Sequence, residues 1–336
     1  MSLLYCVEKN RRYSPIFKGA LANHASMGLI ALNRLGADGA TLKEFFERSE
    51  SSLNHIAEDS LEITKETYGQ YKGEIHAFPA YLEFFTNLAG SSRSVDEIIK
   101  EYLPELMPGL AGGAFHPLIR LSYAIEQGDE EEIVFSLAYF YAAYGDLGQL
   151  PDVGNAAFEP DRFLKKIREQ NDMRLEPSRG LIYAQMKKAG KLAGFNSLIG
   201  GFQPDESCLP GIAKAAVAIY LAAGNIITLH GVTGVHAFRI VIPYLQDLQT
   251  PILALWQAVC AVYIAVSAPE PAVPSREPAV PSRSKNVPDW AAIKTISLKS
   301  TDVHTIKFVY SCVKEERCYN NRDYRVAAMN KISSSR

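Results

Sequence analysis

The sequence predicts an all-α fold, a single large multi-helix domain that a proline-rich loop interrupts. Apolar residues recur mostly at helical spacing, several segments carry helix start and stop signals, and no strand–turn–helix unit of the nucleotide-binding type occurs. With 336 residues, 47% of them hydrophobic, the chain is long enough to bury a sizeable core. We expect this domain to span residues 1–320 and a polar tail to occupy residues 321–336.

Two capping boxes predict helices in the first third of the chain. Residues 41–44 (Thr-Leu-Lys-Glu) and 94–97 (Ser-Val-Asp-Glu) each place a hydroxyl three residues before a carboxylate. In a capping box these two side chains reciprocally satisfy free backbone N–H groups at the start of a helix. The two motifs therefore predict helices over about residues 42–55 and 95–103.

Glycines and carboxylates mark the next two helices. Three glycines within residues 109–113 precede a helical pattern over about 114–127, and Gly128 stands where a left-handed residue commonly ends a helix. The acidic cluster at 129–132 then predicts a second helix start, because carboxylates suit the positive end of a helix dipole.

Two later stretches are very apolar, residues 215–229 and residues 252–266. A Gly-Asn pair at 224–225 breaks the first, and neither reaches the ~20 predominantly apolar residues that a membrane-spanning helix needs. We therefore expect core helices and no membrane span. The apolar pattern at 231–244 between them predicts the centre of the core.

A tandem repeat interrupts the helical pattern. Residues 270–276 (Glu-Pro-Ala-Val-Pro-Ser-Arg) recur unchanged at 277–283. Because proline lacks a backbone donor and has a fixed φ, residues 268–287 are expected to form an extended linker loop, or alternatively a short proline-rich ligand for a partner domain. The helical pattern resumes over about residues 289–316, so the loop lies within one fold.

Composition excludes several classes of partner. A formal net charge of −2 without a basic stripe argues against nucleic-acid binding. The five cysteines form no Cys-x-x-Cys pair, and charged residues begin at Glu8, before a signal peptide could form. We expect a cytoplasmic protein with reduced thiols. The sequence also lacks a flavin or nicotinamide glycine fingerprint, a phosphate-binding loop, a His-Glu-x-x-His motif and a Gly-x-Ser-x-Gly elbow.

Four of the seven histidines lie in apolar stretches that are expected to be buried helices. They are His24, His116, His230 and His304. Neutral imidazole is the commonest metal ligand in proteins, and ligands from distant segments can form one metal site. The competing interpretation of each residue by itself is a hydrogen-bonded core histidine.

The phrases around these histidines resemble the questin oxidase-like family in their order and spacing, over about residues 20–315. The phrases are Asn-His-x-x-Met to Leu-x-Arg-Leu-Gly (23–36), Gly-Gly-Ala-Phe-His-Pro-Leu-Ile-Arg-Leu-x-Tyr-Ala (112–124), Leu-His-x-Val-Thr (229–233) and Asp-x-His-x-Ile-Lys (302–307). The proline repeat departs from the family pattern as a local insertion.

The resemblance implies an oxygenase that opens an anthraquinone-type ring of an aromatic polyketide-like substrate, with dioxygen as co-substrate. Because no flavin fingerprint occurs, the histidines are the expected place of oxygen activation, as ligands of a non-haem Fe(II). NADPH is a candidate reductant. The resemblance also implies that His24, His116, His230 and His304 are the metal ligands.

Lys307 is a further candidate ligand. It stands three residues after His304, so both can lie on one helix face. Burial lowers the pKa of a lysine, and a neutral or carboxylated lysine could bind the metal. Alternatively Lys307 pairs with Asp302 or another carboxylate. Asp302 is off that face, and we expect it to cap the helix instead.

His236 and Arg120 are the candidate catalytic residues. His236 is six residues after His230, about 240° around a helix, so one metal cannot bind both. We select His230 as the ligand because the family phrase centres on it, and we expect His236 either to contact the substrate or to support a ligand through a hydrogen bond. Arg120 shares a face with His116 and could anchor a carboxylate or oxyanion, or close a buried ion pair.

Tyrosines at 139, 141 and 144 could provide an aromatic surface for a polycyclic substrate, although aromatic residues at this spacing are more often core. His55 and His76 lie in polar surroundings and are expected to be solvated. Two other functions compete with the oxygenase. One is a non-catalytic helical protein that binds an aromatic or lipid-like ligand, and the other is a haem protein, for which no Cys-x-x-Cys-His motif is present.

Overall fold

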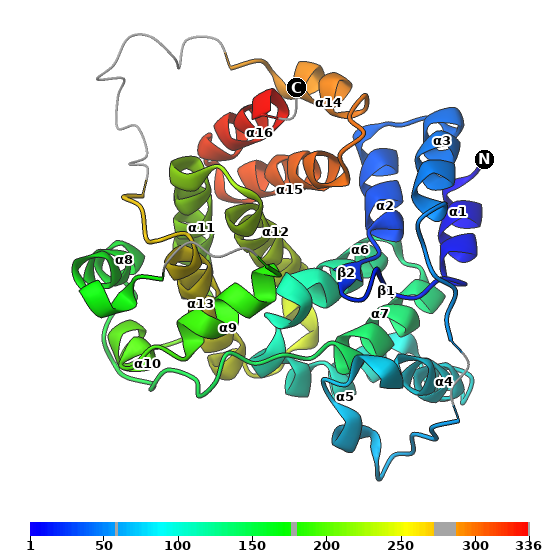
Figure 1. The fold of residues 1–336 in the computed structure, drawn as a ribbon, viewed down its shortest axis with the longest axis horizontal. Coiled ribbons are helices and arrows are strands. Elements are labelled where there is room, and N and C mark those ends of the chain that lie inside the picture. Colours follow the sequence, from blue (N-terminus) through cyan, green and yellow to red (C-terminus); the bar gives the residue numbers. More distant parts are fainter. Residues whose placement is uncertain (58–59, 176–179, 272–286, 335–336) are drawn as a thin grey trace.

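The computed structural model describes residues 1–57, 60–175, 180–271 and 287–334, and its fold is all-α as the sequence predicts (Figure 1). The helices of the first half are α1 (Leu3–Asn10), α2 (Ala25–Leu35), α3 (Gly39–Glu50), α4 (Phe78–Ala89), α5 (Val95–Tyr102), α6 (His116–Gln127), α7 (Glu130–Ala142) and α8 (Pro160–Glu169). Those of the second half are α9 (Ile182–Gly190), α10 (Phe195–Ile199), α11 (Leu209–Ala223), α12 (Ile226–Val241), α13 (Gln249–Ala265), α14 (Trp290–Ser297), α15 (Val303–Tyr319) and α16 (Asp323–Ser334). Two short strands, β1 (Ile16–Phe17) and β2 (Leu21–Ala22), form an antiparallel hairpin.

The two predicted capping boxes have different outcomes. The Ser94 box is present, because the Ser94 hydroxyl accepts from the Glu97 backbone N–H while the Glu97 carboxylate accepts from the Ser94 N–H. The prediction for Thr41 is wrong. Asp38 caps α3 instead, and its carboxylate accepts from both the backbone N–H and the hydroxyl of Thr41. The helix therefore starts three residues earlier than expected and ends at Glu50.

The turn before α6 has an unusual backbone. Gly113, Ala114 and Phe115 all have positive φ angles, of 54°, 57° and 66°, and α6 begins at His116 rather than at the predicted Ala114. Left-handed backbone costs a non-glycine residue roughly 1–2 kcal/mol. Persistent strain of this kind needs compensation from its surroundings and is often found at functional sites. Gly128 ends α6 in the left-handed conformation, as predicted.

The apolar stretches form core helices. Gly224 ends α11 with a φ of 59°, and the Asn225 side chain caps α12, so the predicted break lies between these helices. The segments Glu206–Ala223 and Ile226–Tyr244 are long and apolar enough to cross a membrane by length and composition alone. However, 56% and 67% of their respective residues are buried inside the fold, as in the core helices of many proteins.

The C-terminal part returns to the core. The proline repeat lies largely outside the described residues, at 272–286. After it, the segment expected to be helical over 289–316 forms two helices, α14 and α15. Most of the expected polar tail is helix α16, which packs against α11 and α15 and buries Tyr324 among other residues.

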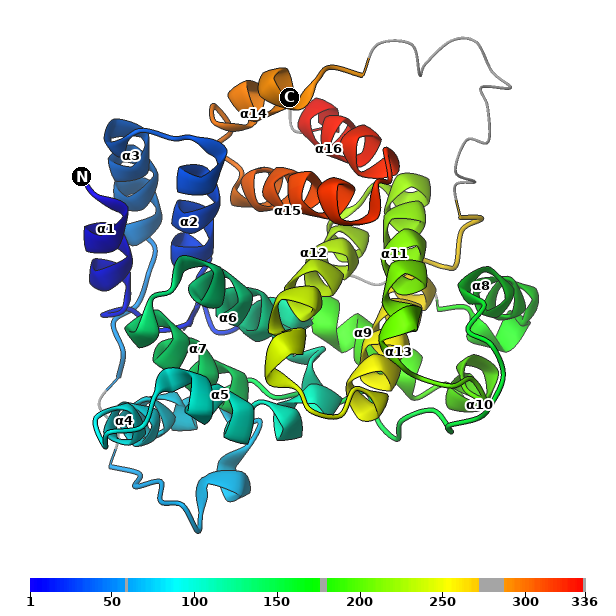
Figure 2. The same cartoon turned by 180° about the vertical axis from the view of Figure 1, so that it is seen from behind.

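Four helices surround the centre of the molecule. Helix α2 packs against α6, α6 against α12, α12 against α15, and α15 against α2, so the contacts close a ring. Both views show this arrangement, with α6 at one end of α2 and α15 beside the other (Figures 1 and 2). The ring joins segments that are more than 270 residues apart in the sequence, since α2 begins at Ala25 and α15 at Val303.

Candidate metal centre

The four predicted histidines come together, one from the N-terminal end of each helix in this ring. His24 directly precedes α2, His116 is the first residue of α6, and His304 is the second residue of α15. His230 is in the first turns of α12. The positive ends of four helix dipoles therefore meet here, which opposes protonation of the imidazoles and favours an anionic ligand.

The imidazole rings form a closed cycle in the same order as their helices. Ring centroids are 4.7 Å apart for His24–His116, His116–His230 and His24–His304, and 5.4 Å apart for His230–His304. One nitrogen of each ring lies within 4.8 Å of the other three. Nitrogens that share one ion at bonds of ~2.1 Å are at most about 4.2 Å apart, so a shift of a few tenths of an ångström would complete such a set.

Backbone and carboxylate acceptors orient three of the rings. The Nδ1–H of His116 donates to the Gly113 carbonyl, and that of His230 donates to the Ile226 carbonyl at 2.7 Å. The Nδ1 of His304 is 3.3 Å from an oxygen of Asp302. Acceptors of this kind are typical of metal-binding histidines, because they fix the tautomer that leaves Nε2 free for the metal.

With the proton on Nδ1, the Nε2 atoms of these rings carry lone pairs, and the closest contacts in the cluster are between Nε2 atoms. The Nε2 atom of His116 is 2.8 Å from Nε2 of His24 and 3.1 Å from Nε2 of His230. With their protons on Nδ1, His116 and His230 direct lone pairs at each other. Two lone pairs cannot form a hydrogen bond with each other, so a cation between them would make the contact favourable.

Protonation of these imidazoles is disfavoured at neutral pH. Burial lowers the pKa of all four histidines, and the charge of Lys307 lowers it further. Neighbouring imidazoles add to this effect for His24, His116 and His230. The pKa of His230 falls to about 3. The donor set therefore fits a metal ion, which is bound by neutral imidazole.

The metal-free protein is expected to lose stability as the pH falls from 6.5 towards 3. In this window the unfolded chain protonates His230, whose ordinary pKa is 6.5, whereas the folded protein does not. His230 alone then lowers the free energy of unfolding by about 1.4 kcal/mol per pH unit. Urea unfolding in a chelator between pH 7.5 and 5 measures this slope. A His230→Gln variant should show a slope smaller by that amount, and an unchanged slope would contradict a neutral, buried His230.

Lys307 lies beside the histidines without an ion-pair partner. It is 1% exposed, burial lowers its pKa to about 7, and its Nζ is 4.0 Å from the sulfur of Met27. Within the described part of the chain no carboxylate pairs with it. Asp302 instead binds Lys331, at 2.8 Å. A half-neutral amine next to the cluster is compatible with the expected ligand role, which stays a prediction.

Asp302 caps α15, as expected, and also contacts one histidine of the cluster. Its carboxylate accepts from the backbone N–H of His304 at 2.9 Å and lies against the His304 ring. Burial would raise the pKa of Asp302, but hydrogen bonds from His304 and Lys331 outweigh this effect and hold the pKa well below its usual value. Asp302 therefore stays ionised and makes the imidazole of His304 a better donor to a cation.

Replacing Asp302 with asparagine is expected to weaken metal binding by about 10- to 100-fold, because the ring of His304 loses its anionic acceptor. Asparagine still caps a helix, so α15 should persist. The matched control is Asp289→Asn, since Asp289 caps α14 through the Ala292 N–H. Equal metal affinities of the two variants, measured by competition with a chelating dye, would contradict the role of Asp302.

The histidines line one end of a largely apolar cavity of about 430 Å³. Tyr139 and Tyr144, two of the three tyrosines proposed from the sequence as an aromatic surface, contribute to its wall. Tyr183 also contributes, and no pattern in the sequence indicated this. Tyr141 is elsewhere, bonded to Glu105. A pocket of this size that is mostly apolar with a few polar groups is typical of small-molecule sites.

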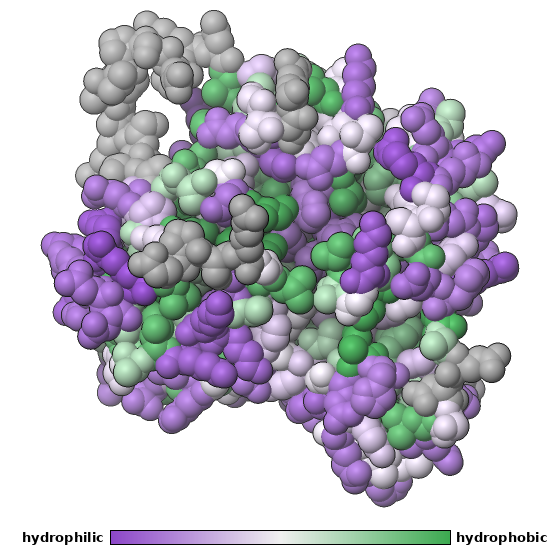
Figure 3. All heavy atoms as spheres, viewed as in Figure 1, coloured by the Kyte–Doolittle hydropathy of each residue, from purple (hydrophilic) through white to green (hydrophobic). Residues whose placement is uncertain are grey.

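Exposed apolar side chains line the same cavity. Leu21, Ile75, Leu181 and Ile226 are each 36–48% exposed, and they come from four separate segments. Figure 3, which has the orientation of Figure 1, shows hydrophobic residues exposed near the centre of the view. Large apolar side chains in such numbers around one cavity are typical of a binding site for a hydrophobic ligand.

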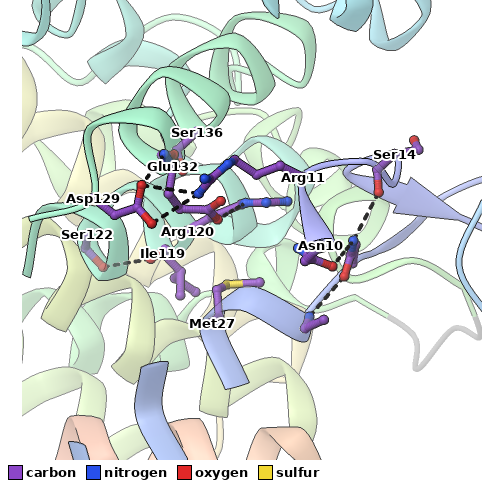
Figure 4. A network of polar contacts seen from close by, with 12 residues as sticks. Asn10, Arg11, Ser14, Met27, Ile119, Arg120, Ser122, Asp129, Glu132 and Ser136 are labelled. Carbon is purple, nitrogen blue, oxygen red and sulfur yellow. Dashed lines mark hydrogen bonds and ion pairs between the residues drawn. The ribbon is translucent and has the colours of Figure 1, made fainter. Parts of the chain in front are cut away.

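The two candidate catalytic residues do not line the cavity. Arg120 is fully buried and donates to Glu132 at 2.8 Å, in a network with Arg11 and Asp129 (Figure 4). The ring of His236 is 2.6 Å from a carboxylate oxygen of Glu315. The geometry therefore gives both residues a carboxylate partner, and a catalytic role for either is not supported by contact with the cavity. His55 and His76 are exposed, as predicted.

Comparison with known proteins supports the family expectation. The model of the family described as Questin oxidase-like matches residues 21–312. This range includes all four histidines of the cluster, Lys307 and Asp302. No curated protein matches the chain.

Proposed function

The chain belongs to the questin oxidase-like family, and from this premise we propose that it is an oxygenase of oxygenated polycyclic aromatic compounds of the anthraquinone type. Its metal would be a non-haem iron held by His24, His116, His230 and His304, with Lys307 as a further candidate ligand. The observation that carries this proposal is the cluster of four histidine nitrogens, in which the Nε2 atoms of His116 and His230 face each other as they would around a shared cation.

Iron is the proposed metal because imidazole ligands suit Fe(II), and the function requires redox chemistry that zinc lacks. Bound iron would supply the one-electron chemistry that lets an aromatic compound react with dioxygen. The four imidazoles would hold it, and the acceptors of His116, His230 and His304 would keep the rings in the binding tautomer. The electrons would come from the substrate or from a reductant such as NADPH.

The cavity supports an aromatic substrate. Its wall is largely apolar, and its tyrosines can pack against a flat ring system. The helix ends that carry the histidines favour a negatively charged oxygen, such as a phenolate of the substrate, at the histidine end. The five cysteines are all free thiols, which is consistent with the cytoplasmic location that we propose.

The test begins with the protein purified without chelators, whose metals are measured by inductively coupled plasma mass spectrometry together with a visible absorption spectrum. We expect stoichiometric iron and no flavin or haem band. After anaerobic loading with Fe(II), addition of a hydroxyanthraquinone should cause oxygen consumption that requires both iron and the quinone. A flavin spectrum would restore flavin chemistry and leave the histidines a structural role, and a Soret band would indicate haem. Tight binding of the quinone without metal or turnover would favour the non-catalytic ligand-binding protein.

A further inference from the structure

Tyr139 is an almost fully buried residue whose hydroxyl group has no partner among the described residues. The residue lies on α7, is 2% exposed and contributes to the wall of the cavity. No hydrogen bond joins its hydroxyl to any residue that the structure describes. By contrast, the hydroxyl of Tyr183 in the same wall donates to the Asp146 carbonyl at 3.0 Å.

The hydroxyl of Tyr139 is also at the histidine end of the cavity. A Cβ atom placed on Gly113 would be 3.5 Å from it, so the hydroxyl lies directly beside this glycine. The carbonyl of Gly113 holds the Nδ1–H of His116, and Gly113 and His116 line the same cavity. A ligand atom bonded to Tyr139 would therefore lie on the side of the cavity that carries Gly113 and His116.

Because no described residue accepts from the Tyr139 hydroxyl, this group is left to bond with what the cavity holds, either water or a ligand. Buried polar groups are nearly always hydrogen-bonded, and the exceptions in a structure usually indicate water, an ion or a ligand. Burial raises the pKa of Tyr139 well above its usual value, so the group keeps its proton throughout the physiological pH range. It is therefore a permanent donor, suited to a carbonyl or phenolate oxygen.

Tyr144 is a weaker candidate for the same role. It is only partly buried, and the ammonium group of Lys72 lies 4.6 Å from the centre of its ring. A partly exposed side chain is held less firmly by its neighbours than the almost fully buried Tyr139, so Tyr144 is less suited to fixing the orientation of a ligand.

We propose that Tyr139 donates a hydrogen bond to a ring oxygen of the bound substrate and so orients the ring against the four histidines. This inference rests on the proposed function for the aromatic nature of the ligand. It adds that the protein selects carbonyl-bearing aromatic rings over hydrocarbons of the same shape, and that one side chain is responsible. A site that hydrogen-bonds a ligand oxygen rejects an analogue that lacks this oxygen.

A pair of soluble three-ring probes tests the selection, anthraquinone-2-sulfonate and anthracene-2-sulfonate, which differ in the two carbonyl oxygens. Their dissociation constants are measured by isothermal titration calorimetry with the full chain as purified, and also for Tyr139→Phe. The control is Tyr183→Phe, which removes a hydroxyl of the same wall that already has a partner. The metal content of each protein is measured in parallel.

We expect the unchanged protein to prefer the quinone by about 3- to 10-fold, the range of a single net hydrogen bond. Tyr139→Phe should abolish this preference by weakening quinone binding alone, whereas Tyr183→Phe should retain it. An undiminished preference in Tyr139→Phe, or no binding of either probe to the unchanged protein, would overturn the inference. Binding is measured without turnover, so the two proposals can fail separately. A protein that lacks iron but shows the Tyr139-dependent preference would refute the proposed iron-dependent function and leave the role of Tyr139 intact.

Discussion

Replacement of His116 with alanine is expected to remove the bound metal almost completely. His116 is the central member of the cluster, since its Nε2 atom contacts those of both His24 and His230. Loss of a ligand should cost more than the 10- to 100-fold that loss of a supporting acceptor typically costs. Metal content per chain after purification, by mass spectrometry, measures the effect. The control is His76→Ala, since His76 is an exposed side chain outside the cluster.

A second variant and a check of folding make this test decisive. His304→Ala removes a ligand from a different helix and should have the same effect, although His304 is less buried than His116. The circular dichroism spectrum of each variant shows whether the helices persist. If both variants fold and bind as much metal as the unchanged protein, the four-histidine metal centre is refuted.

Replacement of Arg120 with alanine is expected to lower the free energy of unfolding by about 3–5 kcal/mol. Its partner Glu132 is equally buried, and the change would leave this carboxylate charged without its partner. The guanidinium also lies 3.8 Å from the centre of the Phe135 ring, a contact that would be lost. Denaturant unfolding measures the loss. Lys43→Ala, in an exposed pair with Glu47, should change stability by well under 1 kcal/mol.

A double variant distinguishes a structural role of Arg120 from the catalytic role that was predicted for it from the sequence. Arg120→Met together with Glu132→Leu replaces the buried ion pair with apolar side chains, which often restores stability. We expect the double variant to regain most of the lost stability and to retain metal and probe binding. A stable double variant that binds metal and substrate but has lost turnover would restore the catalytic assignment.

The sequence by itself determined the local features of this protein. Helix starts and ends follow from residues a few positions apart, such as the Ser94 capping box and the left-handed Gly128. The exception is instructive, because Asp38 and Thr41 could both cap the same helix, and local pattern could not rank them. The phrases around the four histidines indicated the family and the candidate ligands because each phrase is short and contiguous.

Only the tertiary structure decided which side chains meet. Arg120 shares a helix face with His116, yet packing against α7 gives it Glu132 as its partner. His236 likewise lies against Glu315, 79 residues away. No local signal indicated that Tyr183 would line the cavity or that the Tyr139 hydroxyl would stay unpaired. The physical reason is that helix caps and periodicity depend on neighbours in the chain, whereas a cavity depends on the packing of helices from distant segments.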